Sequence, residues 1–146
     1  MVNPVEIEER AQAAVRLFSM GYNCSQAVFA ACADMYGLYD KEVALRVSAS
    51  FGGGIGRMHK TCGAACGMFM LEGLNTGNAI PNNPAGKMQN YARVQMLAGD
   101  FRKKFGSTTC ATLLAGIGRG AAGDNMRKHK CSDMVAEAVR IALSHK

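Results

Sequence analysis

Apolar residues recur every three or four positions along most of the chain, which is the spacing of helices that bury one face. Capping residues such as asparagine, aspartate and threonine precede several of these segments, and glycine follows some of them. No stretch alternates apolar and polar residues for long enough to build a sheet. We therefore predict an all-α bundle of about six helices. The helical segments are residues 5–20, 24–36, 41–50, 62–74 and 84–105, the short apolar stretch 110–115, and a final segment from Cys131 onward.

Two glycine-rich stretches interrupt this pattern and are expected to be connecting loops. The first reads Phe51-Gly52-Gly53-Gly54-Ile55-Gly56 and comes shortly before the predicted helix at Cys62. The second spans residues 116–123. Because no repeat and no linker divides the chain, we expect residues 1–146 to form a single domain.

The composition is typical of a globular protein, because the 146 residues are 49% hydrophobic and 19% charged. No apolar run approaches the roughly 20 residues of a membrane span, so we expect no membrane insertion. The first residues are acidic and lack the basic and apolar regions of a signal peptide. These features predict a cytoplasmic protein whose thiols are reduced by default.

The net charge of +6 raises the question of nucleic-acid binding. The positive charges are scattered, apart from short runs at 102–104 and 127–130, and only 7% of the residues are aromatic. Platforms for single strands interleave aromatic with basic side chains, and this chain does not. We therefore expect no nucleic-acid partner.

The six cysteines are where the sequence concentrates its chemistry. No C-x-x-C pair occurs, which argues against a thioredoxin motif, a c-type haem attachment and paired zinc knuckles. Four cysteines lie at predicted helix starts, where backbone N–H groups and the helix dipole favour an anion: Cys24, Cys62, Cys110 and Cys131. Basic residues precede the second and the fourth. We predict reactive thiolates with lowered pKa values, against the alternative of cysteines buried as small hydrophobic residues.

Three further residues are each compatible with more than one role. Cys32 lies in mid-helix among alanine and methionine, which favours core packing. Cys66 follows Cys62 by four residues on one helical face, so it could join a redox or metal site. His59 could act as the base for Cys62, as a metal ligand or as a solvated loop residue. His145, near the C-terminus, is expected to have no role.

Several glycines are candidates for close approach to the cysteines. Gly53 and Gly54 permit positive φ and a near backbone approach just before Cys62. Gly63 lies inside the following helix, where glycine costs about 1 kcal/mol relative to alanine. These three glycines would leave room for a bound cofactor, or equally for another helix packed against Cys62.

The order of these segments resembles the C_GCAxxG_C_C family, which is prokaryotic and described as redox-active on the strength of its cysteines. The segments that carry the resemblance are GYNCSQAV at 21–28, FGGGIG at 51–56, CGAACG at 62–67 and the single cysteines at 110 and 131. The resemblance implies that the four signature cysteines are Cys24, Cys62, Cys110 and Cys131, with Cys32 and Cys66 as extras. It names no substrate and no reaction.

Three functions fit these features. The first is thiol–disulfide electron transfer to a partner protein, with the four signature cysteines as redox thiols and no cofactor required. The second is a site in which the same four cysteines bind zinc or an iron–sulfur cluster. The third is a non-catalytic helical interaction module whose cysteines only pack. The sequence leaves the pairing of the cysteines open, and a homodimer is compatible with it.

Overall fold

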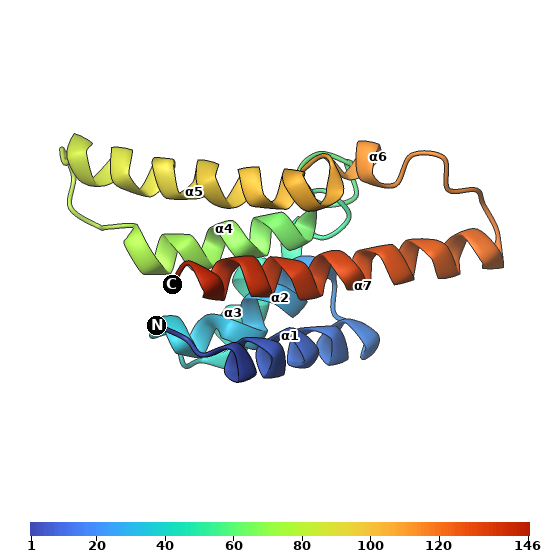
Figure 1. Cartoon of the computed structure of the whole chain (residues 1–146), viewed down its shortest axis with the longest axis horizontal. Coiled ribbons are helices and arrows are strands. Elements are labelled where there is room, and N and C mark those ends of the chain that lie inside the picture. Colours follow the sequence, from blue (N-terminus) through green and yellow to red (C-terminus); the bar gives the residue numbers. More distant parts are fainter.

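The computed structural model describes the whole chain, from Met1 to Lys146, and confirms the predicted all-α bundle (Figure 1). It contains seven α-helices and two short 3-10 helices. In chain order these are α1 (Pro4–Ser19), α2 (Cys24–Cys32), η1 (Ala33–Tyr36), α3 (Lys41–Ser48), η2 (Ala49–Phe51), α4 (Gly63–Thr76), α5 (Pro84–Phe105), α6 (Cys110–Leu113) and α7 (Ala121–Ser144). None of the helices is long and apolar enough to cross a membrane.

Local sequence signals explain where most of these helices begin. Asn23 caps α2 in a capping box, in which its side chain accepts from the N–H of Gln26 and Gln26 reaches back to it. Asp40 caps α3 by accepting from the N–H of Val43. Asn83 caps α5, whose first residue is proline. These starts are therefore determined locally, as the sequence predicts.

Helices α2 and α4 form the centre of the bundle, and α1, α5 and α7 pack around them. Both central helices are apolar on nearly every side and contribute residues such as Val28, Phe29, Met68 and Leu71 to one core cluster. That cluster contains 25 buried residues drawn from all the long helices. The ends of α2 and α4 are consequently fixed by core packing on several sides.

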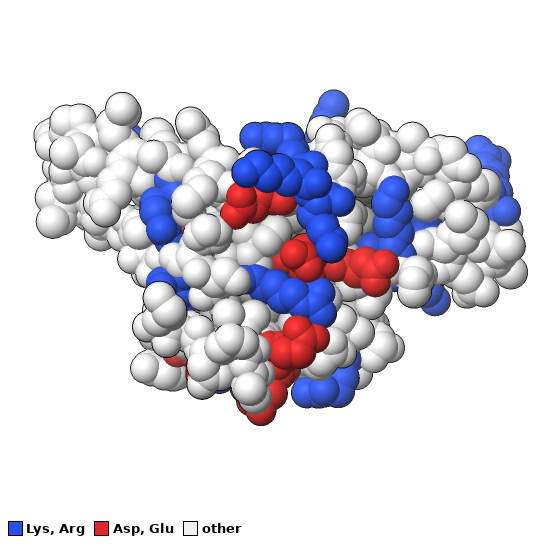
Figure 2. Space-filling view, in the orientation of Figure 1, with Lys and Arg blue, Asp and Glu red and all other residues white.

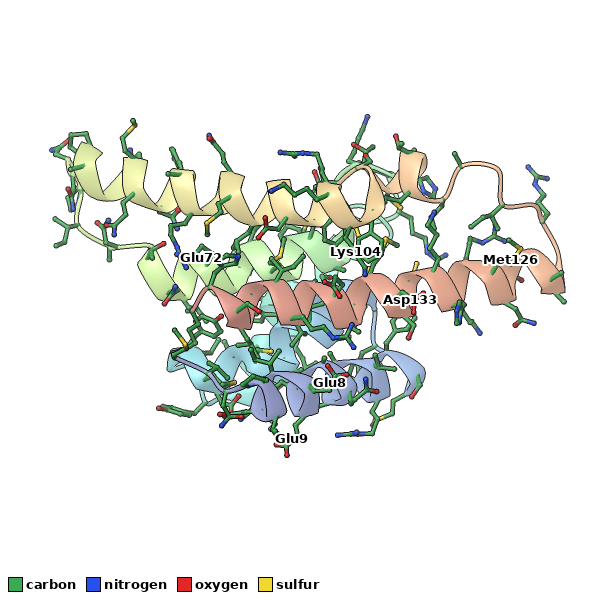
Figure 3. The ribbon with its side chains drawn as sticks, viewed as in Figure 1. Glu8, Glu9, Glu72, Lys104, Met126 and Asp133 are labelled. Atoms are coloured by element: carbon green, nitrogen blue, oxygen red, sulfur yellow. The ribbon has the colours of Figure 1, made fainter.

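The last helix begins earlier than predicted, which is a correction to the sequence analysis. α7 starts at Ala121, so Cys131 lies ten residues inside it rather than at its first turn. The first half of α7 extends beyond the bundle and is mostly exposed, with Met126 outermost among its apolar residues (Figures 1 and 3). Apart from Gly123, which lies against Gly118, this half has no buried residue, so the apolar periodicity that reveals buried helices is absent there.

A polar network fastens the C-terminal end of α7 to its neighbours. Glu72 on α4, labelled in Figure 3, is buried and accepts hydrogen bonds from Thr76 at 2.7 Å and from Arg93 at 3.1 Å. Arg93 also donates to the backbone carbonyl of His145, and the His145 ring lies 2.8 Å from Asp100. His145 therefore has a structural contact that the sequence does not predict, because its ring and backbone tie the end of α7 to α5.

Charged side chains of both signs alternate over the face shown in Figure 2. Arg140 on α7 forms ion pairs with Glu8 on α1 at 2.8 Å and with Glu137 at 3.1 Å. The positive charge of the chain is therefore distributed among ion pairs here and does not form one continuous basic surface on this face.

The buried thiol of Cys32 generates a prediction about stability at high pH. Burial in the core raises the pKa of Cys32 to about 12. The neutral Cys32 thiol therefore contributes fully to the free energy of unfolding below the ordinary thiol pKa near 9. This contribution is lost as the pH rises from about 9 to about 12, by up to about 1.4 kcal/mol per pH unit. In urea unfolding between pH 7 and 11, Cys32→Ala should start less stable but lose stability less steeply than the wild type. Parallel pH profiles would contradict this.

Candidate functional site

Three of the four candidate cysteines lie at helix starts, as predicted. Cys24 is the first residue of α2, directly after the cap Asn23. Cys62 is itself the N-cap of α4, and Cys110 is the first residue of α6, after Thr109. These three sulfurs are therefore placed by the turn that starts each helix.

A short backbone pairing brings the starts of α4 and α6 together. The N–H of Cys62 donates to the carbonyl of Thr108 at 2.7 Å, and the N–H of Cys110 donates to the carbonyl of Lys60 at 2.6 Å. An isolated antiparallel bridge joins Thr61 and Thr109 between these two bonds. Two cysteines separated by 48 residues in the sequence are thus neighbours in space.

The glycine-rich loop fits against Cys110 because two of its residues have no side chain. Gly53 and Gly54 adopt φ of 66° and 72°, a region that favours glycine. A Cβ added to Gly54 would lie 2.6 Å from the Cβ of Cys110, so no other residue fits there. The loop folds back on itself through the N–H of Lys60, which donates to the carbonyl of Gly54 at 2.9 Å.

Gly63 fixes the approach of α2 to α4. A Cβ at this position would overlap the Sγ of Cys24 and would lie 2.7 Å from the carbonyl oxygen of Phe51. One turn further along α4, a Cβ added to Gly67 would lie 2.9 Å from the Cβ of Val28 on α2. The small residues of α4 therefore serve close helix packing, and this packing places the sulfur of Cys24 beside Cys62.

All four candidate cysteines line one small cavity. Its volume is about 50 Å³, which is room for one or two water molecules. The remaining wall is glycine and apolar side chains, so the full lining is Cys24, Gly53, Gly54, Cys62, Gly63, Ala64, Cys110, Leu113, Leu114, Cys131 and Met134. Cys131 enters from the middle of α7 rather than from a helix start. The tertiary fold thus gathers four cysteines that the sequence spreads over 108 positions.

The electrostatics of the cavity differ from the sequence-based prediction. Burial raises the pKa of Cys62 to about 12 and that of Cys131 to about 11, and it also raises the pKa of Cys110. The N–H groups at the start of α4 oppose the shift at Cys62, and the charges of Lys130 and Arg127 oppose it at Cys131, but both are outweighed. The prediction of lowered pKa values is wrong for these three thiols, because desolvation exceeds the helix-end effect.

Cys24 is the thiol whose charge acts on each of the other three cavity cysteines and on Cys66. A negative charge on Cys24 raises the pKa of Cys62, Cys66, Cys110 and Cys131. Like charges repel strongly in a poorly solvated cavity, so a first thiolate keeps its neighbours protonated. The cavity therefore favours at most one thiolate at a time.

His59 lies beside a different cysteine from the one proposed on sequence grounds. Its ring Nδ1 is 3.7 Å from the Sγ of Cys110, whereas the sequence suggested Cys62 as its partner. The backbone pairing explains the difference, because the carbonyl of His59 accepts from the N–H of Ala111 at 3.2 Å. No local pattern could have revealed a contact between residues 51 positions apart.

The two extra cysteines lie outside the cavity. The Sγ of Cys66 donates to the carbonyl of Thr61 at 3.8 Å, and burial raises its pKa to about 11. Cys32 is completely buried in the core, as its sequence context predicts. Neither lines the cavity that the four candidate cysteines share.

The donor side chains do not form a ready-made metal site. No three or more histidine, cysteine, aspartate or glutamate residues stand in an arrangement that could hold a metal ion. Cys24, Cys62, Cys110 and Cys131 would have to rotate and lose protons before they could act together as ligands. The conformation described here is thus that of four separate thiols.

Comparison with known proteins shows the family of the chain. The family model described as "Putative redox-active protein (C_GCAxxG_C_C)" matches residues 22–145. The matched range contains all six cysteines of the chain. Where the family description reads GCAxxG, residues 62–67 of this chain read CGAACG, so the first two letters are in the reverse order. No curated protein and no solved structure matches the chain.

Replacement of Gly63 tests the packing that places Cys24. Gly63→Ala should destabilise the protein by roughly 1–3 kcal/mol, because the new Cβ overlaps the Cys24 sulfur and a backbone carbonyl. Gly73→Ala is the matched control on the same helix, since its Cβ would meet nothing within 4 Å. That control should be stabilising by about 0.5–1 kcal/mol. Thermal or urea unfolding measures both, and equal effects of the two changes would contradict the proposed packing.

Proposed function

Because the chain belongs to the C_GCAxxG_C_C family of redox-active proteins, we propose that Cys24, Cys62, Cys110 and Cys131 carry electrons by thiol–disulfide exchange with a partner protein. The observation that carries this proposal is one small cavity lined by all four cysteines. Four cysteines from four separate segments converge on this one small space. Disulfide formation requires that convergence.

The character of the cavity also suits this chemistry. A thiol pair and a disulfide are both neutral, so conversion of one to the other leaves no charge in poorly solvated surroundings. The raised pKa values of Cys62 and Cys131 keep these thiols protonated near neutral pH. They would then react only when a neighbouring exchange step brings a sulfur within reach, which protects them from non-specific oxidation.

The exchange has a balanced form. One cysteine thiolate attacks a disulfide of the partner, which forms a mixed disulfide and releases one partner thiolate. A second cavity cysteine, after losing its proton, attacks the mixed disulfide, which forms an internal disulfide and releases the other partner thiolate. Two electrons pass to the partner, and its two thiolates take up the two protons that the cysteines lose. The reverse sequence reduces the internal disulfide.

A cysteine-ligated zinc ion or iron–sulfur cluster is the second candidate. The convergence of four sulfurs is also what a Cys₄ site needs, and the N–H groups at the start of α4 would stabilise ligand charge. The side chains as they stand form no such ligand set. We therefore place this candidate second and design a measurement that separates the two.

Paired variants on α2 test the first candidate. Under a glutathione redox buffer the wild type should lose two titratable thiols for each disulfide formed and regain them on reduction. Cys24→Ser should lose most of this reversible oxidation, because the Cys24 sulfur lies against Gly63, next to Cys62, in the shared cavity. Cys32→Ala, which changes a buried cysteine of the same helix, should retain it. If the wild type and both variants are folded and none of them shows a redox response, only a packing role remains for these cysteines.

Metal analysis of protein purified without oxygen tests the second candidate. We expect iron and zinc well below one atom per chain, with no change in Cys62→Ser. One or more metal atoms per chain, lost in Cys62→Ser, would contradict the thiol proposal and establish a cysteine-ligated cofactor.

A further inference from the structure

Cys110 differs from the other cavity cysteines in having a histidine at its sulfur. The Nδ1 of His59 lies 3.7 Å from its Sγ, within the range of a hydrogen bond to sulfur. The Cys110 side chain is almost buried, whereas His59 is exposed. A proton that leaves Cys110 could therefore pass through the imidazole to solvent.

The backbone conformation and hydrogen bonds of His59 determine where its imidazole ring lies. His59 adopts φ of 58°, which is uncommon for a residue with a side chain. Its N–H donates to the carbonyl of Gly53 at 3.1 Å, and its carbonyl accepts from the N–H of Ala111 at 3.2 Å. The same pairing that places Cys110 thus places its histidine, so the two side chains are positioned together.

The charged and titratable groups around this pair come from each neighbouring element. The thiols of Cys24, Cys62 and Cys131 share the cavity with Cys110. The loop that carries His59 also carries Arg57 and Lys60, and α7 contributes Arg127 and Lys130, whose charges act on Cys131. Arg127 is paired with Asp124 at 2.6 Å, so the cations of the His59 loop and Lys130 are the neighbouring charges that no acidic side chain offsets by an ion pair.

We propose that Cys110 is the first nucleophile of the exchange and that His59 accepts its proton, so that a small or peptide disulfide reacts at this sulfur before any other. This inference rests on the proposed thiol–disulfide function. The Cys110 thiolate attacks one sulfur of the disulfide, forms a mixed disulfide and releases a thiolate. Cys24, which lines the same cavity, then attacks the Cys110 sulfur, closes an internal disulfide and releases the second thiolate, which takes up the proton that Cys24 loses.

Glutathione disulfide is the probe that tests this order. The fully reduced wild type is mixed with it, quenched with acid at early times and mapped by mass spectrometry. We expect the first glutathione adduct on Cys110, and we expect it to accumulate in Cys24→Ser because the second step is blocked. His59→Gln should slow adduct formation on the order of tenfold near neutral pH. The matched control is His129→Gln, an exposed histidine outside the cavity, which should leave the rate unchanged.

The outcomes separate this inference from the function on which it rests. A first adduct on Cys24, Cys62 or Cys131 in the wild type would overturn the assignment of Cys110, even if reversible oxidation persists. An equal rate in His59→Gln and His129→Gln would overturn the role of His59. Absence of any reversible oxidation in the wild type would instead overturn the proposed function itself. The wild-type map needs no variant, so the assignment stays testable if Cys24→Ser does not fold.

Discussion

Two backbone hydrogen bonds hold the starts of α4 and α6 side by side, and the arrangement of the sulfurs depends on them. The N–H of Cys62 donates to Thr108 at 2.7 Å, and the N–H of Cys110 donates to Lys60 at 2.6 Å. Both donors are groups that a helix start leaves without a partner inside the helix. The pairing therefore satisfies two helix ends and places two sulfurs at one cavity, while the glycines of the adjoining loop allow the backbones to approach.

The second constraint is the poor solvation of the space that results. A cavity of about 50 Å³ with a largely apolar wall disfavours charge, and burial there raises the pKa of Cys62 to about 12 and that of Cys131 to about 11. Exchange between thiol and disulfide leaves such a space neutral, whereas four thiolate ligands would introduce charge that a metal must offset. The apolar wall therefore suits the proposed exchange, in which only the sulfur of Cys110 ionises. This sulfur lies where the exposed His59 can take its proton.

The sequence was sufficient for features that are determined locally. Cap residues such as Asn23 set the start of α2, and Cys24, Cys62 and Cys110 were correctly placed because a helix start depends on a few adjacent residues. Features that depend on the environment were missed. The first half of α7 is exposed and shows no apolar periodicity. The sequence pattern therefore predicts that this helix begins at Cys131, ten residues after its actual start.

Long-range contacts account for the other differences. Helix-end position alone suggested lowered thiol pKa values, but the enclosing wall that raises them comes from segments distant in sequence. His59 lies three residues from Cys62 in the chain, yet its ring meets Cys110 because the loop pairs with residues 108–111. Sequence spacing carries no information about either effect, because both arise only when distant segments pack together.

Disulfide mapping of the oxidised full chain, by proteolysis and mass spectrometry without reduction, tests most directly whether the four sulfurs share one cavity. We expect every disulfide within the chain to join two of Cys24, Cys62, Cys110 and Cys131, with Cys32 left as a free thiol. Disulfides that include Cys32, or oxidation that occurs only between chains, would contradict the shared cavity as the site of exchange.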